Sequence, residues 1–490
     1  MSESSAAKDN LVVRYFRDFN VLKETRREYW GIQAINVLDS TAYFAMLNIA
    51  VVSFSADFGY DDEQAGYMFT VFSSAVTIML FFSGLLTDWL GIKRAVYVSM
   101  LGQALTRFGV VALAGMAPSG LRNTALIVML LAMAPFTAMV QTMFQAANKR
   151  FTTKRSRGAG FNLWYLFMNV GAAAGGFVID ILYLNLGLPR VHVFTMGALF
   201  GLVAVVIALM TIRNTQQLYG PGEEADEAKD QAKAADEAKE RAEGRGKGPW
   251  QIVKAVVAEP VFWRFTLLIT LLLGVRAVFL YLSLLHPKFW LRVIGEDARI
   301  GFFQALNPIL VIIGLILLIP ILNRFNIYKM LVFGALITSV SLFIQAIPPM
   351  GGADVGEWTT TTTVIFLLVL TMGELIWSPR LQEYTAAIAP EGQEGTYLGL
   401  SMVPYFLAKT VVSVISGHML QRWCPEGMGE RLREGDVPFW DSPYAMWTIL
   451  AAVALVGSLA ALALRGWFTR GTELGRAPRP AEEKASAADA

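Results

Sequence analysis

The sequence has few residues that could form a disulfide, bind a metal ion or face water. Its 490 residues include one cysteine, Cys424, and three scattered histidines (His192, His286 and His418). One cysteine excludes a disulfide framework within the chain. We therefore expect no metal site and no cofactor. Charged residues make up only 16% of the chain, against about 25% in a typical soluble domain. The chain lacks the polar surface that a soluble protein of this size needs.

Long apolar segments occupy most of the sequence instead, and hydrophobic residues make up 55% of it. A spanning helix needs about 20 consecutive, mostly apolar residues. Because unpaired backbone groups cannot face lipid, such segments are expected to be helices. The sequence predicts an all-α integral membrane protein with twelve transmembrane helices. They lie at 30–56, 64–87, 95–116, 124–147, 159–184, 193–212, 261–285, 300–322, 328–347, 363–389, 396–421 and 443–466.

The longest polar interruption, 214–260, divides the predicted spans into two sets of six. Its middle is an alanine-rich run of alternating acids and bases at helical spacing. We interpret it as a solvated linker, with a docking helix as the alternative. The predicted parts are a segment 1–29, a six-helix half 30–213, the linker 214–260, a second half 261–466 and a tail 467–490. This layout is typical of transporters whose two related halves enclose a site at mid-membrane.

Basic residues in the short loops predict the orientation, because Lys and Arg are retained on the cytoplasmic side. Five basic residues precede the first span, two follow the second and five follow the fourth, whereas the loop after the first span is acidic. Both termini are therefore predicted to be cytoplasmic, in a plasma membrane or a bacterial inner membrane. In the same order, these residues are Arg14, Arg17, Lys23, Arg26 and Arg27; Lys93 and Arg94; Lys149, Arg150, Lys154, Arg155 and Arg157; and the acids Asp57, Asp61, Asp62 and Glu63.

The loop between the second and third spans reads GLLTDWLGIKR. It resembles the signature of the major facilitator superfamily at this location, and the resemblance implies that family's fold. Its glycines allow a tight turn and a close approach of helices. Asp88 can pair with Arg94 and hold a cytoplasmic gate shut. The predicted gate residues are Gly84, Asp88, Gly91, Lys93 and Arg94, and Leu86 also matches the signature.

Other segments resemble one branch of that family, the proton-dependent oligopeptide transporters. FNLWYLFMNVGA (161–172) is similar to its fifth-span motif, and ALNPILVIIGLILLIP (305–320) is similar to its eighth span. GELIWSP (373–379) and APEGQEGTYLG (389–399) resemble its tenth and eleventh spans. This resemblance implies proton-coupled uptake of peptides. The first-span coupling motif departs from the family, because NVLDSTAYF (36–44) keeps only Asp39 and Tyr43 in kind, with Ser40 at the family's arginine position.

Four ionisable residues lie in the middle third of predicted spans: Asp39, Arg276, Glu374 and Lys409. A charge at the centre of a spanning helix costs about 2.5–3.5 kcal/mol on insertion scales and usually faces an interior cavity. We predict a charged binding site in which Arg276 clamps a carboxylate and Glu374 meets an amine or takes a proton. The alternative is a set of structural salt bridges. For Arg107, in the third span, the sequence favours neither a role in the binding site nor a local structural partner over the other.

Polar residues at helical spacing extend this candidate site along the fourth and fifth spans. Such a stripe lines a hydrophilic path or bonds to neighbouring helices. The candidate residues for substrate binding and proton coupling are Asp39, Tyr43, Gln141, Gln145, Tyr165, Asn169, Arg276, Asn307, Glu374 and Lys409.

The predicted function is secondary active transport of a small charged or zwitterionic solute, peptide-like or amino-acid-like, by alternating access. We expect proton symport by a monomer whose partners are the solute, protons and the bilayer, and no nucleic acid. A proton-coupled exporter of drugs or metabolites is the first alternative, and a non-transporting receptor or scaffold is the second. A membrane enzyme is disfavoured, because the sequence has no G-x-x-x-x-G-K nucleotide loop and no sizeable soluble domain.

Overall fold

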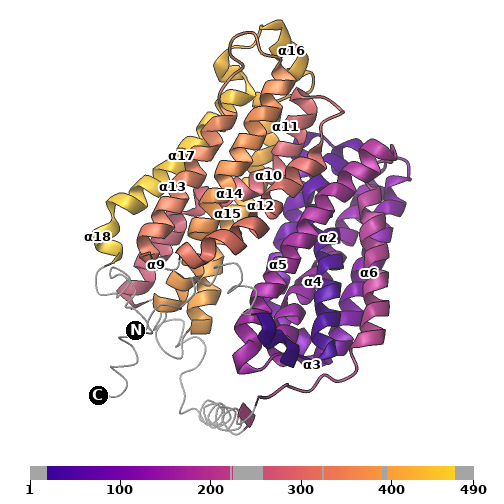
Figure 1. The fold of residues 1–490 in the computed structure, drawn as a ribbon. Coiled ribbons are helices and arrows are strands. Elements are labelled where there is room, and N and C mark those ends of the chain that lie inside the picture. Colours follow the sequence, from indigo (N-terminus) through magenta and orange to yellow (C-terminus); the bar gives the residue numbers. More distant parts are fainter. Residues whose placement is uncertain (1–18, 221–222, 225–257, 323–324, 389–393, 470–490) are drawn as a thin grey trace, which may run out of the picture.

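The computed structural model describes residues 19–220, 223–224, 258–322, 325–388 and 394–469. This part of the chain is built of helices and contains no strand. One bundle comprises the helices before the predicted linker and is called the N-terminal half (Figure 1). Its helices are α2 (Arg27–Ala56), α3 (Asp62–Ala114), α4 (Gly120–Arg150), α5 (Lys154–Asp180) and α6 (His192–Thr211), with the short helices η1 (Phe19–Glu24) and η2 (Ile181–Asn185).

The helices after the linker form a second bundle, the C-terminal half (Figure 1). They are α9 (Pro260–Leu271), α10 (Leu273–Leu284), α11 (His286–Val293), α12 (Ile300–Leu322), α13 (Ile327–Gln345), α14 (Val355–Ile388), α15 (Glu394–Trp423), α16 (Met428–Glu434), η3 (Phe439–Asp441), α17 (Pro443–Ala463) and α18 (Arg465–Phe468). The seventh predicted span is divided between α9 and α10, which meet at a bend of 42°.

The described helices confirm the prediction of an all-α membrane protein. Nine are long and apolar enough to cross a bilayer, or ten if α9 and α10 count as one span. Two predicted spans, 64–87 and 95–116, are the two arms of α3, and the eleventh, 396–421, is helical within α15. The structure is consistent with twelve spans. The predicted linker helix and both chain ends lie outside the described residues.

A turn at Gly91 divides α3 into its two arms. Without a turn, the 53 residues of α3 would extend about 80 Å, far more than a bilayer core of about 30 Å. Gly91 has φ +72° and ψ +155° inside the helix. Only glycine adopts such a conformation without steric cost. The turn therefore requires a glycine at position 91 of the gate motif.

The two ends of the molecule differ in what they carry. At the linker end, α6 ends and α9 begins; at the far end lie α16 and the start of α12 (Figure 1). The first residues of the predicted linker lie against the linker end of the N-terminal half. There the Asn214 amide donates to Glu28 Oε1 at 2.8 Å, and the Leu218 amide donates to the Arg150 carbonyl at 2.8 Å. The start of the linker is thus attached to the N-terminal half.

The halves pack against each other most extensively along two helix pairs, α5 with α12 and α3 with α15. Small residues make this close approach possible. A Cβ atom on Gly176 of α5 would collide with the backbone of Gly301 of α12, and one on Gly417 of α15 would collide with the backbone of Asp62. The backbones of the two halves are therefore in direct contact at both pairs.

Candidate functional site

A cavity of about 370 Å³ lies between the two halves and contains the ionisable groups Glu374 and Lys409. Both come from the C-terminal half, from α14 and α15. The N-terminal half contributes no charged residue to this lining. The lining residues are Tyr43, Phe44, Leu47, Asn48, Phe69, Tyr165, Met168, Asn169 and Ala172 from the N-terminal half, and Phe279, Leu280, Leu282, Ser283, Phe303, Gln304, Asn307, Pro308, Glu374 and Lys409 from the C-terminal half.

Glu374 is positioned by a neighbouring helix. The Asn307 Nδ2 amide of α12 donates to Glu374 Oε2 at 2.9 Å and also lies 2.9 Å from Thr371 Oγ1. Thr371 stands one helical turn before Glu374 on α14. An amide donor satisfies only part of a carboxylate's capacity, since each carboxylate oxygen accepts more than one hydrogen bond. Glu374 therefore keeps acceptor capacity for a further donor.

Lys409 provides the positive charge of the same cavity. Among the residues whose side chains the structure describes, no carboxylate, not even that of Glu374, lies within 4.0 Å of its ammonium group. An ammonium group has three donors and no acceptor. The cavity thus contains an acid and a base that do not form an ion pair with each other.

The wall from the N-terminal half is aromatic and neutral. Its rings are Tyr43, Phe44, Phe69 and Tyr165. The Asn169 amide donates to the Tyr165 carbonyl of its own helix at 2.9 Å. This half therefore offers apolar faces and hydroxyl groups to a solute, in contrast to the charges opposite.

Asp39 lies away from this cavity, in a network inside the N-terminal half. Gln103 Nε2 donates to Asp39 Oδ1 at 3.3 Å and Gln103 Oε1 accepts from Arg107. Arg107 also donates to the Gly197 carbonyl of α6 at 2.9 Å, and only 1% of it is exposed. The network joins α2, α3 and α6, so the geometry gives Arg107 a local partner.

Three further candidates do not line the cavity. Arg276 lies over the ring of Trp377, with its guanidinium carbon 5.9 Å from the ring centre. Gln141 and Gln145 are exposed on α4. Six of the ten candidate residues line the cavity: Tyr43, Tyr165, Asn169, Asn307, Glu374 and Lys409. Sequence reasoning did not identify Asn48 and Ser283, which bond to each other across the halves at 2.8 Å.

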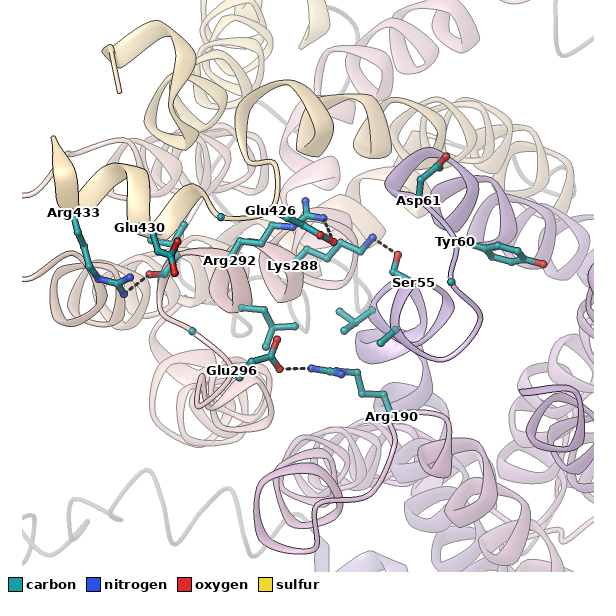
Figure 2. Close-up of a pocket in the computed structure, with 18 residues that line it drawn as sticks. Ser55, Tyr60, Asp61, Arg190, Lys288, Arg292, Glu296, Glu426, Glu430 and Arg433 are labelled. Carbon is teal, nitrogen blue, oxygen red and sulfur yellow. Dashed lines mark hydrogen bonds and ion pairs between the residues drawn. The ribbon is translucent and has the colours of Figure 1, made fainter. Parts of the chain in front are cut away.

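The far end is closed by a buried ion cluster. Asp62, at the start of α3, accepts from Lys288 Nζ at 2.6 Å and from both terminal nitrogens of Arg292 at 2.8 and 2.9 Å. The exposed fractions of the three side chains are 7%, 4% and 11% respectively. Lys288 also donates to Ser55 of α2, and Figure 2 shows these cations beside a second cavity of about 700 Å³. A single N-terminal carboxylate holds two C-terminal cations.

A second group of contacts joins the halves near this cluster. Arg190 pairs with Glu296 at 2.7 Å, and the Tyr183 hydroxyl also donates to Glu296 (Figure 2 shows the ion pair). The Tyr183 hydrogen bond and the Arg190 charge lower the pKa of Glu296. Asp180 of α5 accepts from the first backbone amides of α12, those of Gly301 and Phe302, at 2.6 and 2.8 Å. Its negative charge is favourable at that helix N-terminus.

The linker end has no matching contacts in the described parts of the chain. Hydrogen bonds and ion pairs between described residues of the two halves lie at the far end or at mid-depth, where Ser74 and Thr410 are 3.3 Å apart. The predicted gate residues Asp88, Lys93 and Arg94 are exposed. Among the described residues, Asp88 forms no ion pair here. Pairing of Asp88 with Arg94 stays a prediction for a conformation closed at the linker end.

Comparisons with known proteins agree on the kind of molecule. Residues 30–413 match the protein-family model described as Major Facilitator Superfamily. A relative in Bacillus subtilis (strain 168), the uncharacterized MFS-type transporter YqjV, is 20% identical over 377 residues, which are 76% of this chain and 81% of that protein.

Solved structures with a similar fold include a peptide transporter POT in complex with sulfate. It is 17% identical, with a TM-score of 0.65 over 93% of this chain and 99% of that one. A POT family transporter in complex with 5-aminolevulinic acid is 12% identical, with a TM-score of 0.59 over 92% and 100%. At these identities the likeness shows the fold alone.

Proposed function

The chain belongs to the Major Facilitator Superfamily, and on that premise we propose that it is a proton-coupled secondary transporter of a small zwitterionic solute. A membrane transporter is what the family and the spanning helices support directly. One observation carries the proposal about the solute: Glu374 and Lys409 line one cavity between the halves without pairing with each other. Two half-buried charges of opposite sign are compensated when a solute brings the complementary pair.

The chemistry of the cavity favours an ammonium group at Glu374 and a carboxylate at Lys409. Glu374 and the Asn307 carbonyl oxygen are acceptors, which suits a group with three donors. Lys409 is a point charge with three donors, which suits a carboxylate. The sequence predicted that Arg276 binds the carboxylate of the solute. We propose Lys409 for this role instead, because Lys409 lines the cavity and Arg276 does not.

The volume of the cavity supports a small solute. Sites for small molecules measure about 300–1,000 Å³, and about 370 Å³ lies at the low end of that range. The solute complexed with one of the POT family structures, 5-aminolevulinic acid, also carries one amino group and one carboxyl group. An amino acid or a short peptide is the class that fits.

Transport would proceed by alternating access. The far end is held closed by Asp62, Lys288 and Arg292. With the predicted orientation, this conformation faces the cytoplasm. In the opposite conformation the far end opens, and the gate motif at Asp88 and Arg94 closes the linker end.

Proton coupling would use the two carboxylates on this path. Symport requires the proton and the solute to be bound together, so the proton must bind elsewhere than the carboxylate that holds the ammonium. Asp62 accepts a proton when the far end is open, since in the closed conformation Arg292 and Lys288 lower its pKa. We propose that Asp62 couples protonation to the opening of the far end, with Glu374 as the solute site.

Exchange is the second candidate and has its own supporting observation. Glu374 is the one carboxylate among the described residues that line the cavity. A proton and a cationic solute that compete for one carboxylate are exchanged rather than carried together. The six aromatic lining residues (Tyr43, Phe44, Phe69, Tyr165, Phe279 and Phe303) also suit amphipathic solutes. This combination supports proton-coupled export.

Uptake into liposomes tests the proposal. Purified protein is first screened by thermal shift against amino acids, dipeptides, sugars and cationic drugs, because a ligand that binds only the folded state raises its melting temperature. Labelled alanylalanine and the hits are then followed under imposed pH gradients, with analogues that lack the amino or the carboxyl group as controls. Solute accumulation on the alkaline side supports symport; accumulation on the acidic side supports exchange. Movement of no solute in either gradient would contradict both and favour a receptor or scaffold.

A further inference from the structure

A short line of hydrogen bonds ends at Glu374. The Thr371 hydroxyl donates to the Leu367 carbonyl, one turn earlier on α14, at 2.7 Å. The Asn307 amide nitrogen lies 2.9 Å from that same hydroxyl oxygen and 2.9 Å from Glu374 Oε2. Thr371 is only 2% exposed. Its hydroxyl is therefore shielded from bulk solvent.

The direction of these bonds is determined by a count of hydrogens. A threonine hydroxyl has one hydrogen, and in Thr371 that hydrogen is donated to the Leu367 carbonyl. Towards Asn307, the Thr371 oxygen can therefore only accept. The Asn307 amide must present its NH₂ group to Thr371, and the same NH₂ group reaches Glu374. A flipped amide would place two acceptor oxygens against each other, which is unfavourable.

The orientation of this amide matters because it decides which form of Glu374 is favoured. A hydrogen bond donated to a carboxylate stabilises the charged form, and one accepted from a carboxylic acid stabilises the neutral form. We propose that Thr371 is a positioning residue that fixes the polarity of the Asn307 amide and so holds Glu374 in its ionised form. This inference rests on the proposed function only in that the ionised form is the one that binds an ammonium group.

Other charged or titratable groups lie in the region of Glu374. Tyr165 of α5 and Lys409 of α15 line the same cavity, and Arg276 of α10 lies over Trp377, three residues from Glu374. None of them contacts Thr371 in the described bonds. A substitution at Thr371 leaves all three in place. Any change in the ionisation of Glu374 is then assigned to the Asn307 amide.

The test follows the carboxylic-acid band of Glu374 by infrared difference spectroscopy on the full chain in lipid discs. The Glu374→Gln variant identifies the band. Thr371→Val keeps the shape of the side chain and removes the hydroxyl, so the Asn307 amide can flip. We expect the pH midpoint of the band to rise by about one unit, a tenfold change in proton affinity. Thr371→Ser, which keeps the hydroxyl, should stay within about 0.3 units of the wild type.

Thr362→Val is the matched control. Thr362 is also buried on α14, and its hydroxyl bonds only to the Trp358 and Thr359 carbonyls of its own helix. It should leave the band unchanged. Should Thr371→Val fail to fold, Thr371→Ala removes the same hydroxyl with a smaller side chain.

Two results would overturn the inference. One is an identical band in the wild type and the hydroxyl-free variant from about pH 4 to about pH 10. The other is a shift in Thr371→Ser as large as in Thr371→Val. A purely structural role would lower the melting temperature without moving the midpoint. The proposed function fails separately, if no zwitterion binds to the wild-type protein.

Discussion

The two halves of the molecule both place charges at mid-membrane but use them differently. In the N-terminal half, Asp39 accepts a hydrogen bond from Gln103, which in turn accepts one from Arg107 inside the bundle. In the C-terminal half, Glu374 and Lys409 line the cavity and do not pair. The Asp39 network has its partners without a solute. Glu374 and Lys409 gain charged partners when a zwitterionic solute binds.

This difference separates depth from function. An ionisable group in a spanning helix is costly wherever it lies, so depth alone predicts only that it has a partner. Asp39 has its partner in its own half, whereas the ammonium of Lys409 has no carboxylate partner among the described residues. The partner, rather than the depth, distinguishes a structural charge from a binding charge. Four tests with five substitutions, described from the largest expected effect to the smallest, follow from this distinction.

Arg107→Met should cause the largest loss of stability. It removes the positive charge that Gln103 links to Asp39 and leaves Gln103 and the Gly197 carbonyl without their donor. Each buried acceptor left without a donor costs about 1–3 kcal/mol, and Asp39 also loses a nearby positive charge. Thermal unfolding in detergent should show a markedly lower melting temperature, which Asp39→Asn in the same chain partly restores.

The exposed Arg94 on the same helix provides the control, since Arg94→Met should leave the melting temperature unchanged. If Arg107→Met instead retains full stability and abolishes transport, the N-terminal network is functional and the comparison fails.

Asp62→Asn should have the second-largest effect and act on the far end. It removes the carboxylate that Lys288 and Arg292 share and leaves Arg292 with only the longer contact of 3.8 Å to the exposed Glu426 among the described residues, a cost of about 2–3 kcal/mol to the closed conformation. Spin labels at Met116 and Arg431, in a Cys424→Ser background, should report a longer distance across the far end.

The neighbouring Asp61→Asn is the matched control, because asparagine caps a helix as well as aspartate. A far end that stays equally closed in Asp62→Asn would show that the ion cluster does not hold the gate.

Lys409→Met and Glu374→Gln should lower transport with little loss of stability. Each removes one of the two charges offered to the solute, so zwitterion uptake should fall by about tenfold or more, or about 1.4 kcal/mol. The melting temperature should stay the same or rise, because a charge inside a spanning helix is removed. Each substitution should lower uptake much less for analogues that lack the group its residue binds, the carboxyl group for Lys409 and the amino group for Glu374.

Lys329→Met and Glu357→Gln are the controls, as both side chains are exposed in the C-terminal half. If Lys409→Met and Glu374→Gln lower the melting temperature without changing which solutes are transported, Glu374 and Lys409 are structural charges, as Asp39 is.

Glu296→Gln should give the smallest effect. Its pKa is lowered by Tyr183 and Arg190 across the halves, so its contribution to closure is present above its ordinary pKa and is lost as the pH falls through the lowered value. Because Glu296 is largely exposed, that contribution is below about 1 kcal/mol. The spin-label distance in the wild type should lengthen slightly on acidification, and in Glu296→Gln this response should shrink.

Asp297→Asn, at the next exposed position, should leave the acid response intact. An equal response in both variants would assign it to another carboxylate.

Much of the fold could be predicted because the bilayer imposes it. The first span was predicted at 30–56 and is Arg27–Ala56, and the last was predicted at 443–466 and is Pro443–Ala463. Apolar runs of the necessary length allow few alternatives. Glu374 and Lys409 were predictable for a similar reason, since few deep charges exist in such a chain.

The far-end gate and the aromatic wall could not be predicted from the sequence. Asp62 is one of four acids in a loop, which indicated only the orientation of the chain. Its partners are more than 220 residues away, and nothing local marks the pairing. Phe69 is one of 31 phenylalanines, so its place in the cavity wall depends wholly on packing.

The contact of Gly176 with Gly301 has a mechanical consequence. It lies near the far end of α5, about 22 residues or some 33 Å from the start of that helix at Lys154. If the halves turn about this contact as a fulcrum, the two lever arms are unequal. A rotation of about 10° would move the linker end by about 6 Å and the short arm by only about 1 Å. A gate on the short arm needs only a small displacement, which short bonds such as those of Asp62 can resist.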